Sequence, residues 1–174
     1  MSKCSRIILF LVILTCLAPS LQDARAERGP STVAERTRAV QVAKSLRTDP
    51  LSSEVQNDRE WVIKWLIEIP DISVNYCTNF LGDLGDKKNG YSGALIASIM
   101  ANEASFIIEH PDKSRDVNAL YFAGVDGAID SYQAIQKQDT QYHLAHLDEL
   151  LQMREQGKLK DYVRATAKIC KKKN

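Results

Sequence analysis

Apolar side chains recur along most of this chain at intervals of three and four residues, the spacing that one face of an α-helix requires. From about residue 33 onward the pattern predicts five to six helices, separated by turns that contain proline or glycine. The predicted helices cover about residues 33–46, 54–69, 91–109, 113–138, 144–157 and 159–170.

The second of these helices, "EVQNDREWVIKWLIEI", is apolar on two sides. We expect Ser52 or Ser53 to cap its start and Pro70 to end it. A helix that is apolar on two sides is expected to pack on two sides, which places this one at the centre of the predicted fold. Its faces consist of Trp61, Val62, Trp65, Leu66 and Ile69 on one side and of Ile63 and Ile67 on the other.

Two segments between the second and third helices fit the helical pattern less well. The segment "ISVNYCTNFL" (72–81) predicts a short helix capped by Asp71, although the alternation of Ile72, Val74 and Tyr76 also allows a strand. A single strand would lack partners in an otherwise helical chain. The segment "GDLGDKKNGYSG" that follows has four glycines and is expected to be a loop.

These elements indicate an all-α protein, and we expect residues 33–170 to form a single irregular helical bundle. A helical repeat array is the alternative, because the spacing of Ala128, Tyr132 and Ile135 resembles the second helix of a tetratricopeptide repeat. The first-helix signature of that repeat is missing upstream, and no self-similarity at the repeat length occurs elsewhere. We therefore favour the bundle.

The first 26 residues have the features of a secretory signal peptide. Two basic residues precede the apolar run "IILFLVILTCLA" (7–18), and "ARA" (24–26) supplies the small residues that a signal peptidase requires. The run is shorter than the ~20 residues of a membrane-spanning helix. Lipid attachment at Cys16 is an alternative that the preceding residue fits poorly. We expect cleavage after Ala26 and a soluble mature chain, secreted or periplasmic, without an integral membrane segment.

Removing this leader would leave 148 of the 174 residues and change the formal net charge from +1 to −1, since the leader holds three basic residues and one acidic residue. A near-neutral protein lacks the strongly basic face that nucleic-acid binding requires, so we expect no nucleic-acid partner. We interpret residues 27–32 as a flexible lead-in to the first helix. The lysine-rich residues 171–174 are interpreted as a solvated basic tail.

Two cysteines, Cys77 and Cys170, remain after cleavage. An even number of cysteines in an exported chain favours a disulfide. Cys170 shares a helical stripe with Leu159, Val163 and Ala167, and it therefore faces inward as such a bridge requires. Closing a loop of roughly 90 residues would stabilise the fold by ~4–5 kcal/mol. Two buried, unpaired thiols are the alternative.

A polar pair interrupts the apolar segment "ALIASIMANEASFIIEH" (94–110). On a helical wheel Glu103 lies in the middle of the apolar arc, whereas Asn102 lies at its rim and is interpreted as an ordinary edge residue. Glu103 is either an acid or base in a pocket or, as we favour, a structural residue held by a tyrosine hydroxyl, a basic side chain or backbone N–H groups. The tyrosines available as donors are Tyr76, Tyr91, Tyr121 and Tyr132.

Catalysis by Glu103 would require a second group, and two histidines are candidates. His143 and His146 are three residues apart, which brings two imidazoles to one helix face. With Glu103 or Glu149 they would supply the ligands of a zinc site. The spacing is common by chance and the H-E-x-x-H motif is absent, so these residues are weak metal candidates.

Asp126 and Asp130, one helical turn apart, are a second candidate pair of catalytic groups. They fall opposite the apolar stripe of their helix, and we therefore interpret them as part of a solvated face. The chain also contains no G-x-S-x-G, G-x-G-x-x-G or P-loop motif. The sequence thus favours a non-catalytic protein, and no cofactor is expected.

The sequence leaves two functional hypotheses. The first is an exported helical protein that binds a partner protein or a small apolar ligand, or has an accessory role in the cell envelope. Trp61, Trp65, Met100 and Phe106 could line an apolar cleft for that purpose, although their helical spacing fits core positions better. The alternative is a hydrolase or metal-dependent enzyme that uses Glu103 with His143 and His146, and it requires these three side chains to converge.

Overall fold

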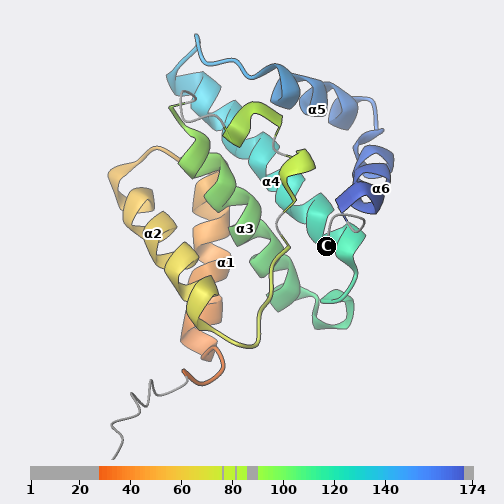
Figure 1. Cartoon of the computed structure of the whole chain (residues 1–174). Coiled ribbons are helices and arrows are strands. Elements are labelled where there is room, and N and C mark those ends of the chain that lie inside the picture. Colours follow the sequence, from red (N-terminus) through yellow and green to blue (C-terminus); the bar gives the residue numbers. More distant parts are fainter. Residues whose placement is uncertain (1–27, 76, 81, 86–89, 171–174) are drawn as a thin grey trace, which may run out of the picture.

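The structure is a computed structural model that describes residues 28–75, 77–80, 82–85 and 90–170 (Figure 1). These residues form an all-α fold, as the sequence predicts, and no β-strand occurs among them. The six α-helices are α1 (Val33–Thr48), α2 (Ser53–Glu68), α3 (Ser92–Glu109), α4 (Val117–Gln138), α5 (Ala145–Glu155) and α6 (Leu159–Cys170). Three short 3₁₀ helices are η1 (Thr78–Phe80), η2 (Gly82–Gly85) and η3 (Pro111–Lys113).

Side-chain caps fix where the helices begin. The hydroxyl of Thr32 accepts a hydrogen bond from the backbone N–H of Glu35, whose carboxylate accepts in return from the N–H of Thr32, so a capping box starts α1. Ser52 caps α2, as predicted. The fourth helix begins four residues later than predicted, because residues 111–113 form η3 and Asp116 then caps α4.

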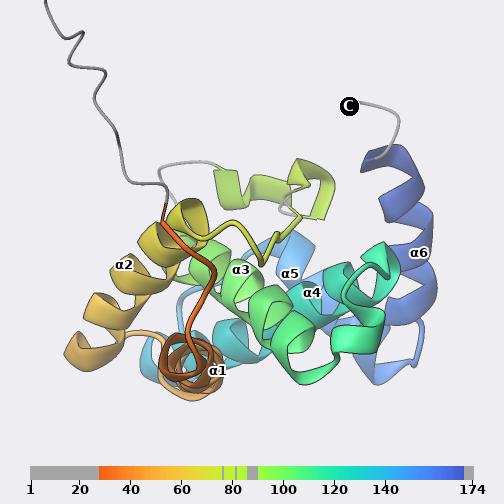
Figure 2. The same cartoon turned by 90° about the horizontal axis from the view of Figure 1, so that it is seen from below.

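Helices α3 and α4 pack against each other at the centre of the bundle, and α1 contacts both (Figures 1 and 2). Helix α2 covers α1 and α3 on one flank, while α5 and α6 contact α4 on the other. The prediction that α2 is the centre was therefore wrong. Its Trp65 side is buried, but Ile63 is only half-buried and Ile67 is 77% exposed, because none of the described helices covers the second apolar face.

Two glycines of α4 allow the close approach of α3. A Cβ atom on Gly124 would lie 3.0 Å from both Ile99 Cγ2 and Glu103 Cγ. A Cβ on Gly127 would lie 2.3 Å from Asn102 Cγ, which is well inside van der Waals contact. The two polar residues of α3 therefore occupy space that only glycine leaves free on the facing helix.

The segment after α2 differs from its prediction. Residues 72–75 form neither helix nor strand but an extended connection after α2 (Figure 1), and among the described residues of the segment a helical turn forms only at η1. Asp71 does not cap a helix but accepts hydrogen bonds from the backbone N–H and the hydroxyl of Ser31, at 2.8 and 2.7 Å. The described part of the expected lead-in (27–32), residues 28–32, thus contacts the bundle. The predicted signal peptide (1–26), Tyr76 and the basic tail (171–174) lie outside the described residues.

The structure contains the predicted pair of Cys77 and Cys170 at disulfide distance, with Cα atoms 5.9 Å apart. Cys170 is 8% exposed and faces the core, as its helical stripe predicts. The pair joins the residues just before η1 to the last residue of α6, which are 93 positions apart in the chain. No helix in the described part of the chain has the length and apolar character needed to cross a membrane.

Candidate functional site

Glu103 is fully buried in α3, as the helical wheel predicts. Its Oε2 accepts a hydrogen bond of 2.7 Å from the backbone N–H of Asn75, in the extended segment that crosses α3. Its Oε1 has no hydrogen-bond partner in the described part of the protein and lies 3.1 Å from the position of a Cβ on Gly124. A backbone N–H is one of the partners that the sequence suggested. Two of the tyrosines that the sequence offered as donors bond elsewhere, Tyr91 to Asp139 and Tyr132 to Asp148.

Burial raises the pKa of Glu103 to about 8, and the hydrogen bond from Asn75 opposes this rise only in part. The carboxyl group is therefore mostly protonated at pH 7. The pKa of the nearby Tyr121 hydroxyl is also raised, first by its own burial and then by the proximity of Glu103. Glu103 is thus a neutral acid, enclosed between α3, α4 and the extended segment.

Asn102 is not the edge residue that we predicted. Its side chain is buried, with 5% of the residue exposed. Its Oδ1 accepts a hydrogen bond of 3.0 Å from Arg47 Nη1, and its Nδ2 donates one of 2.8 Å to the backbone oxygen of Ser98. The wheel placed Asn102 beside the apolar arc, but α1 and α4 both cover that side of α3. Asn102 therefore belongs to the polar contacts at the junction of these helices.

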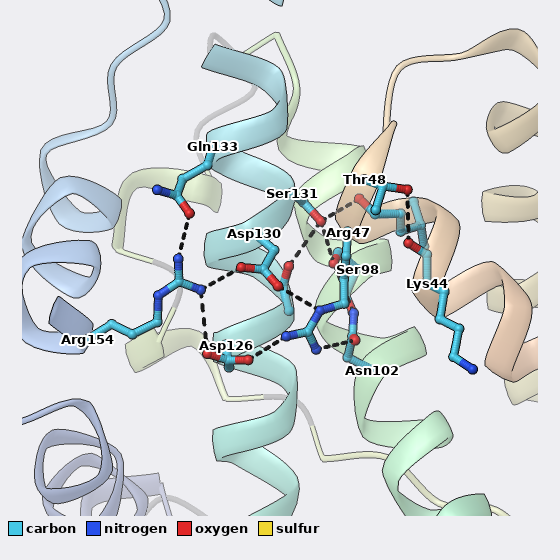
Figure 3. Close-up of polar contacts among 12 residues, drawn as sticks. Lys44, Arg47, Thr48, Ser98, Asn102, Asp126, Asp130, Ser131, Gln133 and Arg154 are labelled. Carbon is cyan, nitrogen blue, oxygen red and sulfur yellow. Dashed lines mark hydrogen bonds and ion pairs between the residues drawn. The ribbon is translucent and has the colours of Figure 1, made fainter. Parts of the chain in front are cut away.

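Asp126 and Asp130 are likewise not on a solvated face. Arg47 of α1 donates to Asp126 Oδ2 at 2.5 Å and to Asp130 Oδ2 at 2.8 Å, and Arg154 of α5 donates to Asp130 Oδ1 at 2.6 Å (Figure 3). The side chains of these four residues are between 23% and 32% exposed. Two positive and two negative charges thus neutralise each other where α1, α4 and α5 meet, which indicates a structural role.

His143 and His146 contact other residues than those that surround Glu103. The side chain of His143 is 63% exposed, and its Nδ1 lies 3.6 Å from Asp148 Oδ2. The Nε2 of His146 lies 3.2 Å from the backbone oxygen of Phe80, and its ring lies against Gly82. Among the described residues, no group of three or more His, Cys, Asp or Glu side chains could hold a metal ion. The structure therefore does not bring Glu103, His143 and His146 together.

None of four well-formed hollows in the described part of the protein is lined by all four candidate cleft residues. Trp65 is 1% exposed and stacks on Trp61, with ring centroids 5.4 Å apart. The guanidinium carbon of Arg38 lies 4.1 Å from the centre of the Trp61 ring. Phe106 packs against His110 near the end of α3, at 4.6 Å between ring centroids. Met100 is half-buried.

A hollow of about 780 Å³, lined by none of these four residues, lies between α2 and the first half of α3. We call it the α2–α3 groove. Ile67 stands exposed at its edge, and a Cβ on Gly90 or Gly93 would meet no atom within 4 Å, so the groove is open to solvent. In the sequence, the second apolar face of α2 was the feature that pointed to this groove. The apolar side chains that line the groove are Leu51, Ile63, Ile67, Tyr91, Ala94 and Ala97.

Comparisons of the chain with protein-family models, with curated proteins and with solved structures found no match. Three features therefore remain from which a function can be inferred. They are the protonated Glu103, the neutralised Arg–Asp junction of α1, α4 and α5, and the α2–α3 groove. Glu103 is enclosed by the fold, and the charges of the partly exposed Arg–Asp junction are paired with one another. The groove, in contrast, presents apolar side chains to solvent.

Proposed function

We propose that this chain is an exported protein without catalytic activity that binds another protein surface through the α2–α3 groove. The observation that carries the proposal is the exposure of Ile67, 77% of which is open to solvent beside other apolar groove residues. A contiguous apolar surface of this kind is typical of protein interaction sites. Burying such a side chain under a partner contributes ~1.5–3 kcal/mol.

The shape of the groove favours a protein over a small apolar ligand as its occupant. Small-molecule sites enclose most of the surface of their ligand. Here one wall is the exposed side of a helix, and the two glycines leave the other side open. An open groove of this form fits side chains that project from a partner, such as those of a helix.

Export is proposed on the basis of the N-terminal sequence. The basic start, the apolar run and the small residues up to Ala26 fit a cleaved signal peptide. The distance between Cys77 and Cys170 supports an oxidising compartment, where such a pair persists as a disulfide. We expect the mature chain to reach the periplasm or the outside of the cell.

The groove can be tested with anilinonaphthalene sulfonate, a dye that becomes fluorescent on apolar surfaces. Dilute native protein should bind the dye saturably, and Ile67→Gln should weaken binding about tenfold. The matched control is Val33→Gln, which replaces an equally exposed apolar residue that is not among those lining the groove. If both variants bind the dye as the parent does, the groove is not an apolar binding surface.

Export can be tested by expressing the full chain in a bacterial host and recovering it from the periplasm or medium. The intact mass should correspond to a chain that begins at residue 27, with no free thiol. An uncleaved chain retained in the cytoplasm with its thiols free would contradict this part of the proposal.

A further inference from the structure

We infer that the occupant of the α2–α3 groove is α2 of a second copy of this chain, in a two-fold symmetric dimer whose α2 helices run antiparallel. This inference rests on the proposed function, because it names the partner of the same groove. Ile63 and Ile67 of each copy supply the apolar contact, and the charged residues beside them determine how the two copies are oriented.

The charges along the groove are mixed in sign. Two basic residues, Arg59 and Lys64, and two acidic residues, Glu60 and Glu68, line it together with the apolar side chains. A partner with a single sign of charge would meet as much repulsion as attraction here. A second copy carries the same balanced set, and a suitable rotation can place each charge opposite its complement.

Glu60 and Lys64 carry the argument for orientation. They are one helical turn apart and both exposed, with 77% of the Lys64 side chain open to solvent. If a two-fold axis passes midway between them and the helices are antiparallel, Glu60 of each copy faces Lys64 of the other. One symmetry operation then forms two identical ion pairs and brings the two Ile63 side chains near the axis.

Among the described residues of one copy, these charges are only weakly engaged. Lys64 Nζ lies 3.8 Å from Glu68 Oε1, the length of a loose ion pair, and Glu68 is also bonded by Arg28 at 2.9 Å. Exposed pairs contribute little affinity but select orientation and partner. The apolar contact of Ile63 and Ile67 must therefore supply most of the affinity, so both kinds of residue have to be tested.

The first test is sedimentation equilibrium of the oxidised chain from residue 27, over a wide range of protein concentration. We expect a monomer–dimer equilibrium that Ile67→Gln weakens about tenfold or more and that Val33→Gln leaves unchanged. A chain that is monomeric at every concentration overturns the inference. If such a monomer still binds the dye at Ile67, the proposed function stands and only the identity of the partner is wrong.

The second test uses charge reversal. Glu60→Lys alone and Lys64→Glu alone each place like charges opposite one another twice, and each should weaken the dimer about tenfold or more at low salt. The double variant, and an equimolar mixture of the two single variants, should both restore association to within about threefold of the parent. The double variant keeps the parent's net charge. Single variants that associate as the parent does, or a double variant that stays monomeric, would overturn the antiparallel arrangement.

Discussion

Replacing Glu103 with glutamine should remove a strong dependence of stability on pH. Burial raises the pKa of Glu103 to about 8 in the native state, against an ordinary value of 4.5. Between these two pH values the native protein holds the proton and the unfolded chain has lost it. Native Glu103 therefore favours folding fully only below pH 4.5, and this contribution is lost progressively as the pH rises to 8.

The size of the effect follows from the width of this window. Each pH unit between 4.5 and 8 lowers the free energy of unfolding by ~1.4 kcal/mol, or ~5 kcal/mol across the window. At pH 7 the loss amounts to ~3 kcal/mol, a large part of the stability of a typical domain. Glu103→Gln keeps the shape and an oxygen that can accept from Asn75, but it has no proton to lose.

Urea unfolding of the parent and of Glu103→Gln, at half-unit steps from pH 4 to pH 9, measures this difference directly. The two proteins should have free energies of unfolding within ~1 kcal/mol of each other at pH 4. The variant should then become progressively the more stable, up to pH 8. The control is Glu109→Gln, an exposed acid at the end of the same helix, whose curve should run parallel to the parent's.

Parallel curves for the parent and Glu103→Gln would refute the reasoning. They would mean that Glu103 has the same pKa in the native protein as in the unfolded chain, which requires a positive partner or access to water. The interpretation of Glu103 as a buried, protonated acid would then be wrong, and Glu103 would again be a candidate catalytic residue.

Three further predictions concern the packing around this helix. Arg47→Met should destabilise the protein by about 2 kcal/mol in urea unfolding, because Arg154 is then the only positive partner of Asp126 and Asp130 among the described residues. An unchanged midpoint would show that the junction is solvated. Gly127→Ala should lower the stability of the protein by ~2 kcal/mol or more, since its Cβ would lie 2.3 Å from Asn102 Cγ. Gly93→Ala, whose Cβ would meet no atom within 4 Å, should raise the stability by ~0.5–1 kcal/mol. Equal melting temperatures of the two variants would contradict the close approach of α3 and α4. Reducing the Cys77–Cys170 pair should lower the stability of the protein by ~4 kcal/mol. Thiol counting of unreduced exported protein should find no free thiol, and two free thiols would contradict the bridge.

The helices could be predicted because their signals are local. Ser52, Pro70 and the apolar stripes lie within or beside the helices that they define. The burial of Glu103 was also predictable, since its wheel position depends only on its own helix. The same reasoning failed at Asn102 and Asp130, because a wheel gives a direction but not the neighbour in that direction.

Arg47 illustrates what the sequence did not reveal. It lies in the last turn of α1, where the neighbouring sequence is polar and predicts only the end of a helix. Its guanidinium group nevertheless donates hydrogen bonds to three side chains on α3 and α4. No local pattern connects positions separated by 55 to 83 residues. The α2–α3 groove was missed for a related reason. The apolar face of Ile63 and Ile67 was visible, but whether a helix covers it depends on the arrangement of the whole bundle.

The central claim is that this protein acts through the α2–α3 groove, while Glu103 is part of the architecture. The most direct test is a methyl NMR titration of isoleucine-labelled protein with anilinonaphthalene sulfonate. We predict saturable shifts of the Ile63 and Ile67 methyl resonances and none at Ile99, which packs beside Glu103 against Gly124. Shifts at Ile99 with Ile67 unmoved would contradict the account.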